Sequence, residues 1–207
     1  MQFILTVSQF IRLCVETGHA CSFTLLKKMK KVFCNPKVKD KVTVLKTAEE
    51  TNNEFILVEV ELAPGGGTPK HYHTTFNETF FPVQGLPDVE VGRKQLLLQG
   101  TAIATAKKNE IHRFYNPGND TIRFRVKISP AETRFLESLS IGYGLANDGK
   151  TNDKGIPKKL DHLAVLIEHS NSRFTGFLSL IEPLLLWRAK KARKKGVLNE
   201  LLEQYCS

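Results

Sequence analysis

The segment GGGTPKHYHTTFNETFFPVQG, residues 65–85, decides the fold and the chemistry that we expect for this chain. It holds two histidines, His71 and His73, and a glutamate, Glu78. Alternate residues of a β-strand point to the same face, so the two imidazoles project together while Tyr72 points away. A tight hairpin through the short polar stretch before Glu78 would return its carboxylate to their side. The segment therefore predicts three ligands of a metal site.

The sequence around this segment has the period of β-strands. In FILVEVEL (55–62) and IRFRVKI (122–128), apolar residues alternate with charged ones, as in strands with one buried face. Turn sequences such as PGGG (64–67) and PGND (117–120) separate the apolar runs. Many short strands joined by such turns predict a mainly β fold, either a sandwich or a barrel.

A third histidine completes the expected site. His112 lies in KKNEIHRFYN (107–116), before a strand, and inward residues of neighbouring strands converge in a small barrel. Three imidazoles and one carboxylate suit a divalent transition ion (iron, manganese, nickel, copper or zinc) and not calcium or magnesium. Phe80 shares the face of Glu78, and Phe114 that of His112. We expect these two rings either to line an apolar substrate pocket or to pack in the core.

The motif resembles the first signature of the cupin superfamily, G-x5-H-x-H-x(3,4)-E-x6-G. Every element matches, from Gly65 through the two histidines and Glu78 to Gly85. The second signature, G-x5-P-x-G-x2-H-x3-N, matches at His112 and Asn116 only. Lys107 stands in place of the proline and Asn109 in place of the turn glycine. Gly100 lies one residue further from the histidine than the signature requires. Asparagine tolerates the left-handed backbone well, so the replacement at 109 is compatible with the turn.

The resemblance implies a small antiparallel jelly-roll β-barrel over residues 36–130. It also implies that the metal ligands are His71, His73, Glu78 and His112, inside the wider mouth of the barrel. It does not imply a reaction, because similar proteins include dioxygenases, isomerases, decarboxylases, storage proteins and ligand-binding domains of regulators.

Two further regions flank the expected barrel. Residues 131–207 carry apolar residues at helical spacing and predict a helical C-terminal appendage, whose first helical segments are joined by a loop, GYGLANDGKTNDKGIP (142–157). Residues 1–35 form an N-terminal extension, either a short amphipathic helix or sequence upstream of a true start at Met29.

The net charge of +9 is concentrated near the C-terminus, where RAKKARKK (188–195) holds six of the thirty basic residues. This run is the solvated end of a helix, a contact with anionic lipid through residues 177–195, or a nucleic-acid contact, in that order of preference. We expect no nucleic-acid partner, because no recognition motif accompanies the charge.

The sequence leaves two functions open. One is a metal-dependent enzyme, of oxygenase or isomerase type, that acts on a small organic molecule; the other is a non-catalytic module that binds a small ligand and contacts a partner or membrane surface through its helical part. No apolar run approaches the length of a membrane span, and the four cysteines form no disulfide or zinc pattern. We expect a soluble, cytoplasmic homodimer.

Overall fold

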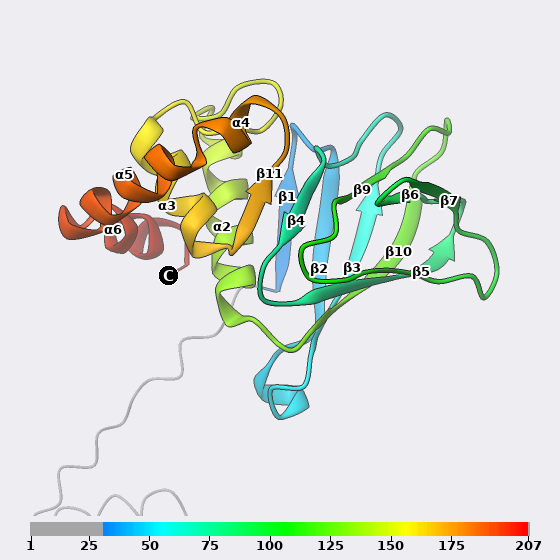
Figure 1. Ribbon diagram of the computed structural model, residues 1–207. Coiled ribbons are helices and arrows are strands. Elements are labelled where there is room, and N and C mark those ends of the chain that lie inside the picture. Colours follow the sequence, from blue (N-terminus) through cyan, green and yellow to red (C-terminus); the bar gives the residue numbers. More distant parts are fainter. Residues whose placement is uncertain (1–30, 207) are drawn as a thin grey trace, which may run out of the picture.

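The computed structural model describes residues 31–206. The region before it, where we expected either a short amphipathic helix or a true start at Met29, lies outside the described residues. Within the described range, a six-stranded and a five-stranded sheet form the barrel, and the helices gather on one side of it (Figure 1).

The strands of both sheets pair antiparallel. The first sheet has the order β1-β2-β3-β10-β5-β8, with β1 (Val32–Asn35), β2 (Asp40–Lys46), β3 (Ile56–Leu62), β10 (Ile122–Ser129), β5 (Asn77–Gln84) and β8 (Ala104–Ala106). The second has the order β11-β4-β9-β6-β7, with β11 (Ser172–Phe174), β4 (His71–His73), β9 (His112–Tyr115), β6 (Asp88–Val91) and β7 (Lys94–Leu97). A short 3-10 helix, η1 (Glu49–Thr51), joins β2 to β3. Strand β1, which we assigned to the N-terminal extension, belongs to the first sheet.

The expected alternation is confirmed in β3 and β10. These strands pair with Val58 opposite Val126, and their apolar residues are buried between the sheets. On the outer face, Arg125 Nε donates to Glu59 Oε2 at 3.0 Å. Burial of each large apolar side chain contributes about 1.5–3 kcal/mol. The inward side chains of β3 and β10 are therefore a main source of the barrel's stability.

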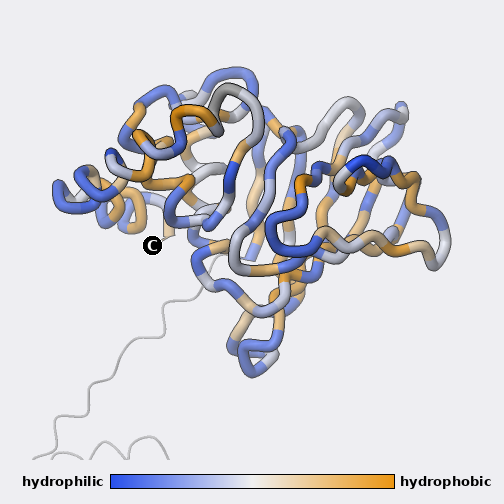
Figure 2. Tube along the Cα trace, in the orientation of Figure 1, coloured by the Kyte–Doolittle hydropathy of each residue, from blue (hydrophilic) through white to orange (hydrophobic). Residues whose placement is uncertain are grey.

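The C-terminal part is mainly helical, as predicted. Its helices are α2 (Thr133–Asn147), α3 (Leu160–His169), α4 (Phe177–Leu180), α5 (Glu182–Lys194) and α6 (Val197–Tyr205). Hydropathy changes along its last third, from apolar over α4 to hydrophilic at the far end of α5 (Figure 2). No helix among the described residues is both long and apolar enough to traverse a lipid bilayer.

Two local predictions about this part were wrong. Residues 142–147, which we expected to begin a loop, continue α2 to Asn147. Residues 172–174 form β11, a strand inside the region expected to be helical, because they pair with the open edge of β4.

The glycine content misled the loop prediction, because Gly144 serves close helix packing. A Cβ at this position would lie 2.1 Å from Cδ1 of Tyr205 in α6, so only glycine lets that ring approach α2. Ser140 Oγ, one turn earlier, also donates to the carbonyl oxygen of Tyr205. The end of α6 is therefore fixed against α2.

We predict that Gly144→Ala destabilises the protein by about 1–3 kcal/mol, because the added methyl group overpacks the ring of Tyr205. Gly142→Ala is the matched control in the same helix, since its Cβ would meet Leu166 at an ordinary 3.6 Å. That change should stabilise the helix by up to about 1 kcal/mol. Urea unfolding followed by circular dichroism measures both, and equal effects of the two substitutions would contradict the packing role of Gly144.

Candidate metal centre

The structure brings all four expected ligands together. His71 and His73 lie on β4, Glu78 on β5 and His112 on β9. His71 and His112 face each other directly across two paired strands. One ligand atom from each of the four residues lies within 4.8 Å of the other three.

The route from the histidines to Glu78 differs from the expected hairpin. Strands β4 and β5 belong to different sheets, so the chain crosses between the sheets after His73 instead of reversing beside β4. Phe76 anchors the crossing. Its ring stacks on that of His73, with 4.2 Å between the ring centroids, and contacts the ring of Phe135 of α2 edge-on, with 5.8 Å between the centroids. Burial of this phenylalanine inside the barrel mouth draws the chain across, and Glu78 then faces the histidines from the opposite sheet.

Each histidine uses its Nδ1 atom for an outer hydrogen bond. The Nδ1 atoms of His71 and His112 lie 2.8 Å and 2.9 Å from the carbonyl oxygens of Pro69 and Glu110, which can only accept. His73 Nδ1 lies 3.1 Å from Ser172 Oγ, a hydroxyl that itself donates to a backbone carbonyl oxygen in its own turn. These bonds place a proton on each Nδ1 and turn the Nε2 atoms toward the cluster, the orientation of metal-binding histidines.

The electrostatics of the cluster favour a cation. Burial alone would raise the pKa of Glu78, but the charge of His73 and the hydrogen bond from His112 hold that pKa well below its usual range. Burial lowers the pKa of His112, yet the hydrogen bond to Glu78 and its charge raise it overall. Burial and the neighbouring charges of His112 and His73 lower the pKa of His71 to about 3, so its ring is neutral. An ionised carboxylate thus faces the neutral ring of His71.

The donor set fits a divalent transition ion. His73 Nε2 is buried, lies 3.4 Å from Glu78 Oε1 and makes no hydrogen bond. A buried nitrogen without a partner is costly, and a metal ion would satisfy it. Imidazole nitrogens with one carboxylate oxygen suit iron, manganese, nickel, copper or zinc.

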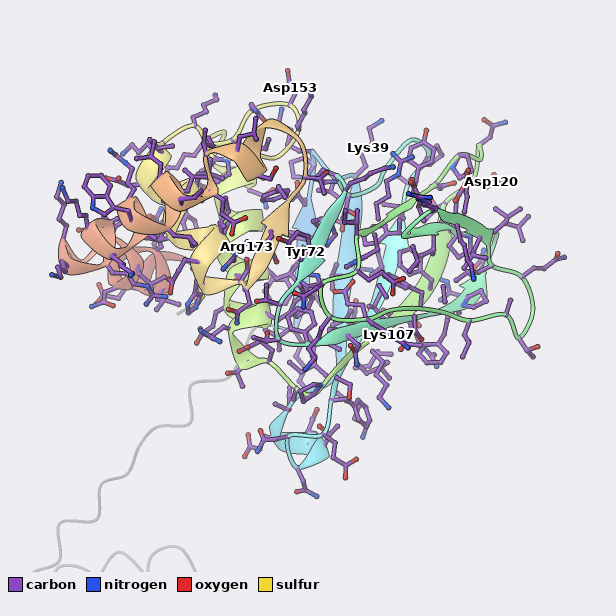
Figure 3. All side chains as sticks on the ribbon, viewed as in Figure 1. Lys39, Tyr72, Lys107, Asp120, Asp153 and Arg173 are labelled. Atoms are coloured by element: carbon purple, nitrogen blue, oxygen red, sulfur yellow. The ribbon has the colours of Figure 1, made fainter. Side chains whose placement is uncertain are left out.

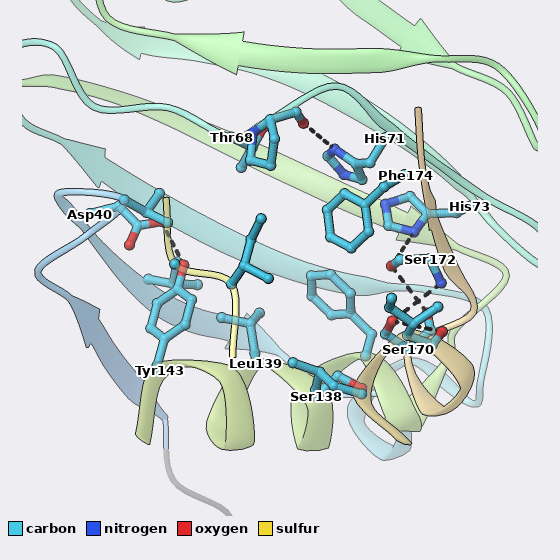
Figure 4. Close-up of a pocket in the computed structure, with 18 of the residues that line it drawn as sticks. Asp40, Thr68, His71, His73, Ser138, Leu139, Tyr143, Ser170, Ser172 and Phe174 are labelled. Atoms are coloured by element: carbon cyan, nitrogen blue, oxygen red, sulfur yellow. Dashed lines mark hydrogen bonds between the residues drawn. The ribbon is translucent and has the colours of Figure 1, made fainter. Parts of the chain in front are cut away.

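The cluster opens into a cavity of about 260 Å³ between the barrel and the helices. His71, His73 and Glu78 line it. Its other walls are mainly apolar and come from both parts of the chain, among them Val58, Val60, Val126, Leu139, Leu166 and Phe174. The helical part thus roofs the barrel mouth, and the histidines stand at one end of the cavity (Figure 4).

The two expected pocket residues have different positions. Phe114 lines the cavity. Phe80 is fully buried beneath the cluster, with its ring 6.1 Å from that of His112 and 6.4 Å from that of Phe124, and is not among the lining residues. The larger space lies toward the helices, so the inward face of β5 below Glu78 is filled by the core.

The turn and the asparagine of the second signature have structural roles. Asn109 adopts φ 66°, which confirms that asparagine replaces a turn glycine here. Asn116 is buried, and its Nδ2 donates to the carbonyl oxygens of Leu62 and Asp120 at 2.9 Å and 2.8 Å. This side chain connects the end of β9 to the end of β3. The connection fixes the position of β9, which begins with His112.

Strand β11 supplies what sequence reasoning missed. It pairs with β4 so that Ser172 lies opposite His73 and Arg173 opposite Tyr72, whose side chains lie beside each other in Figure 3. Arg173 Nε also forms an ion pair with Glu182 of α5 at 2.8 Å. Ser172 lies 99 residues from His73 in the sequence. The one sequence signal for this contact is the alternation of residues in a strand of three residues. The helical part therefore contributes directly to the centre.

The family comparison agrees with this geometry. Residues 58–128, which contain all four ligands, match the cupin domain family. The barrel is a cupin domain. The match ends just before α2, so the helical roof lies outside the region that matches the family.

Solved structures with a similar fold are distant in sequence. A predicted oxalate decarboxylase from Thermotoga maritima is 20% identical over 44% of this chain and 79% of its own, with a TM-score of 0.41. The protein TT1209 from Thermus thermophilus is 20% identical over 48% and 90%, with a TM-score of 0.43. The polyketide cyclase RemF from Streptomyces resistomycificus is 20% identical over 44% and 66%, with a TM-score of 0.40. No curated protein matches the chain significantly.

We predict that Ser172→Ala lowers the affinity for a transition ion about 10–100-fold, as is typical when the hydrogen bond that orients a histidine ligand is removed. Ser179→Ala, on the exposed surface of α4, is the matched control and should leave affinity unchanged. Competition with a chromophoric zinc chelator measures both, and equal affinity of the two variants would contradict the role of β11.

Proposed function

We propose that this cupin binds a divalent transition ion at His71, His73, Glu78 and His112 and acts on a small organic molecule held in the adjacent cavity. The observation that carries the proposal is that three of these four residues line the cavity. An ion there faces whatever the cavity holds. A bound transition ion supplies a Lewis acid, or a redox centre if it is iron, manganese or copper, which suits chemistry of the isomerase or oxygenase type.

The chain's own residues define how a ligand is held. The valine side chains of the barrel and the leucine side chains of α2 and α3 give walls that exclude water and bind apolar surface. In so apolar a site, interactions with the charged cluster are stronger than in water. The ligand is therefore oriented by one polar end, which meets the cluster.

The cluster itself is tested by metal content. His71→Ala and His112→Ala should each lower affinity for the ion by more than the roughly 100-fold expected for an orienting residue. His162→Ala, on α3 and outside the cluster, is the control and should bind as the unchanged protein does. Elemental analysis of protein purified without added metal, with chelator competition, gives both values. Unchanged metal content in the two cluster variants would contradict the proposed site.

Catalysis and simple binding are distinguished by the ion that co-purifies. A redox-active ion together with substrate-dependent uptake of oxygen supports an oxygenase. A zinc protein that binds small ligands without turnover supports the alternative, a non-catalytic binding module. Isomerase chemistry would show turnover without oxygen uptake.

We also propose that the outer face of α4 and α5 contacts an anionic membrane surface. Leu180, at the end of α4, is 78% exposed, and Leu184 and Trp187 of α5 are 54% and 51% exposed. Leu184, Trp187 and Lys191 follow helical spacing along α5. The ammonium group of Lys191 lies 3.8 Å from the centroid of the Trp187 ring. The same helix buries Leu185, Ala189 and Ala192, so the exposed apolar row is not needed for packing.

The charge on this face matches anionic lipid. Four exposed lysines follow the apolar row: Lys190, Lys191, Lys194 and Lys195. The two arginines of the run instead form ion pairs inside the helical part, Arg188 with Asp161 and Arg193 with Glu168. A tryptophan and leucines bordered by lysines are typical of helices that lie in a membrane interface.

Replacing the four lysines with glutamine should weaken binding to vesicles that contain phosphatidylserine by at least about tenfold, because each lysine near such a surface contributes about 1 kcal/mol. Four exposed lysines of the barrel, Lys46, Lys94, Lys107 and Lys108, changed to glutamine, are the charge-matched control. Sedimentation with phosphatidylserine and with neutral vesicles measures the effect. Equal loss in both quadruple variants, or no binding by the unchanged protein, would overturn the membrane contact.

A further inference from the structure

The cavity has a second polar end, remote from the metal centre. Asp40 begins β2 and Tyr143 lies in α2, and both line the cavity. Tyr143 Oη donates to Asp40 Oδ2 at 2.5 Å. Figure 4 shows this pair at one end of the cavity and His71 and His73 at the other, with Leu139 between them.

The hydrogen bonding of Asp40 is incomplete. Asp40 is only 7% exposed, and its Oδ1 atom is buried without a hydrogen-bond partner. A carboxylate oxygen in this position carries a desolvation cost that a donor would offset. Burial raises the pKa of Asp40 to about 7, against the lowering effect of the bond from Tyr143.

Tyr143 cannot relieve this deficit, because it has one proton and that proton is already directed at Oδ2. Burial and the charge of Asp40 raise the pKa of Tyr143 well above its usual range, so the hydroxyl stays protonated. A second buried hydroxyl lines the same cavity without a partner: Ser138 Oγ, on a residue 8% exposed. The cavity thus presents two buried polar atoms that the protein itself does not satisfy, Asp40 Oδ1 from β2 and Ser138 Oγ from α2.

Helix α2 sets the length between the two ends. Phe135 touches Phe76, which stacks on His73, and Tyr143 follows eight positions later in the same helix. Eight residues of α-helix span about 12 Å. A cavity of about 150 Å³ accommodates benzene, so 260 Å³ suits a longer molecule of roughly ten to twelve non-hydrogen atoms.

We propose that the cavity binds an elongated, mainly apolar molecule with an oxygen ligand for the metal at one end and a hydroxyl or ammonium group at the other, which donates to Asp40. This inference rests on the proposed function, because the metal centre holds the first end. Asp40 is then the residue that selects for the far-end donor, and Tyr143 is a positioning residue that fixes the carboxylate.

Two probes that differ by one hydroxyl test the inference: 3-(4-hydroxyphenyl)propanoate and 3-phenylpropanoate. In zinc-loaded protein, at a pH above the Asp40 pKa of about 7, the hydroxylated probe should bind about tenfold more tightly or better, the range expected for a hydrogen bond to a charged acceptor. Asp40→Asn keeps an acceptor for Tyr143 but turns a neutral amide toward the probe in place of the charged oxygen, so it should lower the preference to the few-fold value of a neutral hydrogen bond. Calorimetric titration measures the four affinities.

Further readouts separate this role from a purely structural one. If the Asp40–Tyr143 pair only ties β2 to α2, Asp40→Asn and Tyr143→Phe lower stability in urea but leave the ratio of the two affinities unchanged. Under the proposal, Tyr143→Phe retains most of the preference and Asp40→Asn loses most of it. Equal binding of both probes, or binding of neither, to protein that holds zinc would overturn this inference and leave the metal site standing. Failure to hold zinc would overturn the proposed function and this inference with it.

Discussion

The pairing of β11 with β4 is the constraint on which the rest of the structure depends. It places Ser172 against His73 and closes the second sheet at the barrel mouth. Because α3 leads into β11 and α4 and α5 follow it, the same short strand fixes the helices over the opening. The outer hydrogen bond of His73, the roof of the cavity and the position of the basic helix all follow from it.

The barrel and the helices divide the chemical work. The barrel supplies the charged cluster, whose carboxylate stays ionised because the imidazoles surround it. The C-terminal part as a whole, with its loop and β11, supplies most of the remaining lining residues and one partner of the Asp40–Tyr143 pair. Low polarity between the two charged ends strengthens hydrogen bonds and ion contacts at both of them, and makes each unsatisfied polar atom costly. Selectivity among cupins with the same four ligands can then reside in segments outside the barrel.

Much of the barrel could be predicted from sequence, because its signals are local. The alternation in β3 and β10 marks buried faces, and the spacing of His71, His73 and Glu78 is legible within one segment. The crossing between sheets was missed, since a short polar stretch has the same sequence in a hairpin and in a crossing, and only burial of Phe76 decides between them. A tertiary contact also explains the error at Gly144. From sequence this glycine indicates a loop, but in the structure it lies in α2 and gives room to the ring of Tyr205. Asp40 carries no sequence signal at all, because its environment comes from a helix more than a hundred residues away.

The late position of β11 has a consequence for synthesis on the ribosome. Strand β4 has β9 on one side and β11 on the other, so its second edge has no partner until residues 172–174 have emerged. Contacts between such distant segments form slowly, and an open strand edge can pair with another chain. The nascent barrel therefore carries an exposed, histidine-bearing edge while the 99 residues that follow His73 are made, and during that interval the edge is open to pairing with another chain.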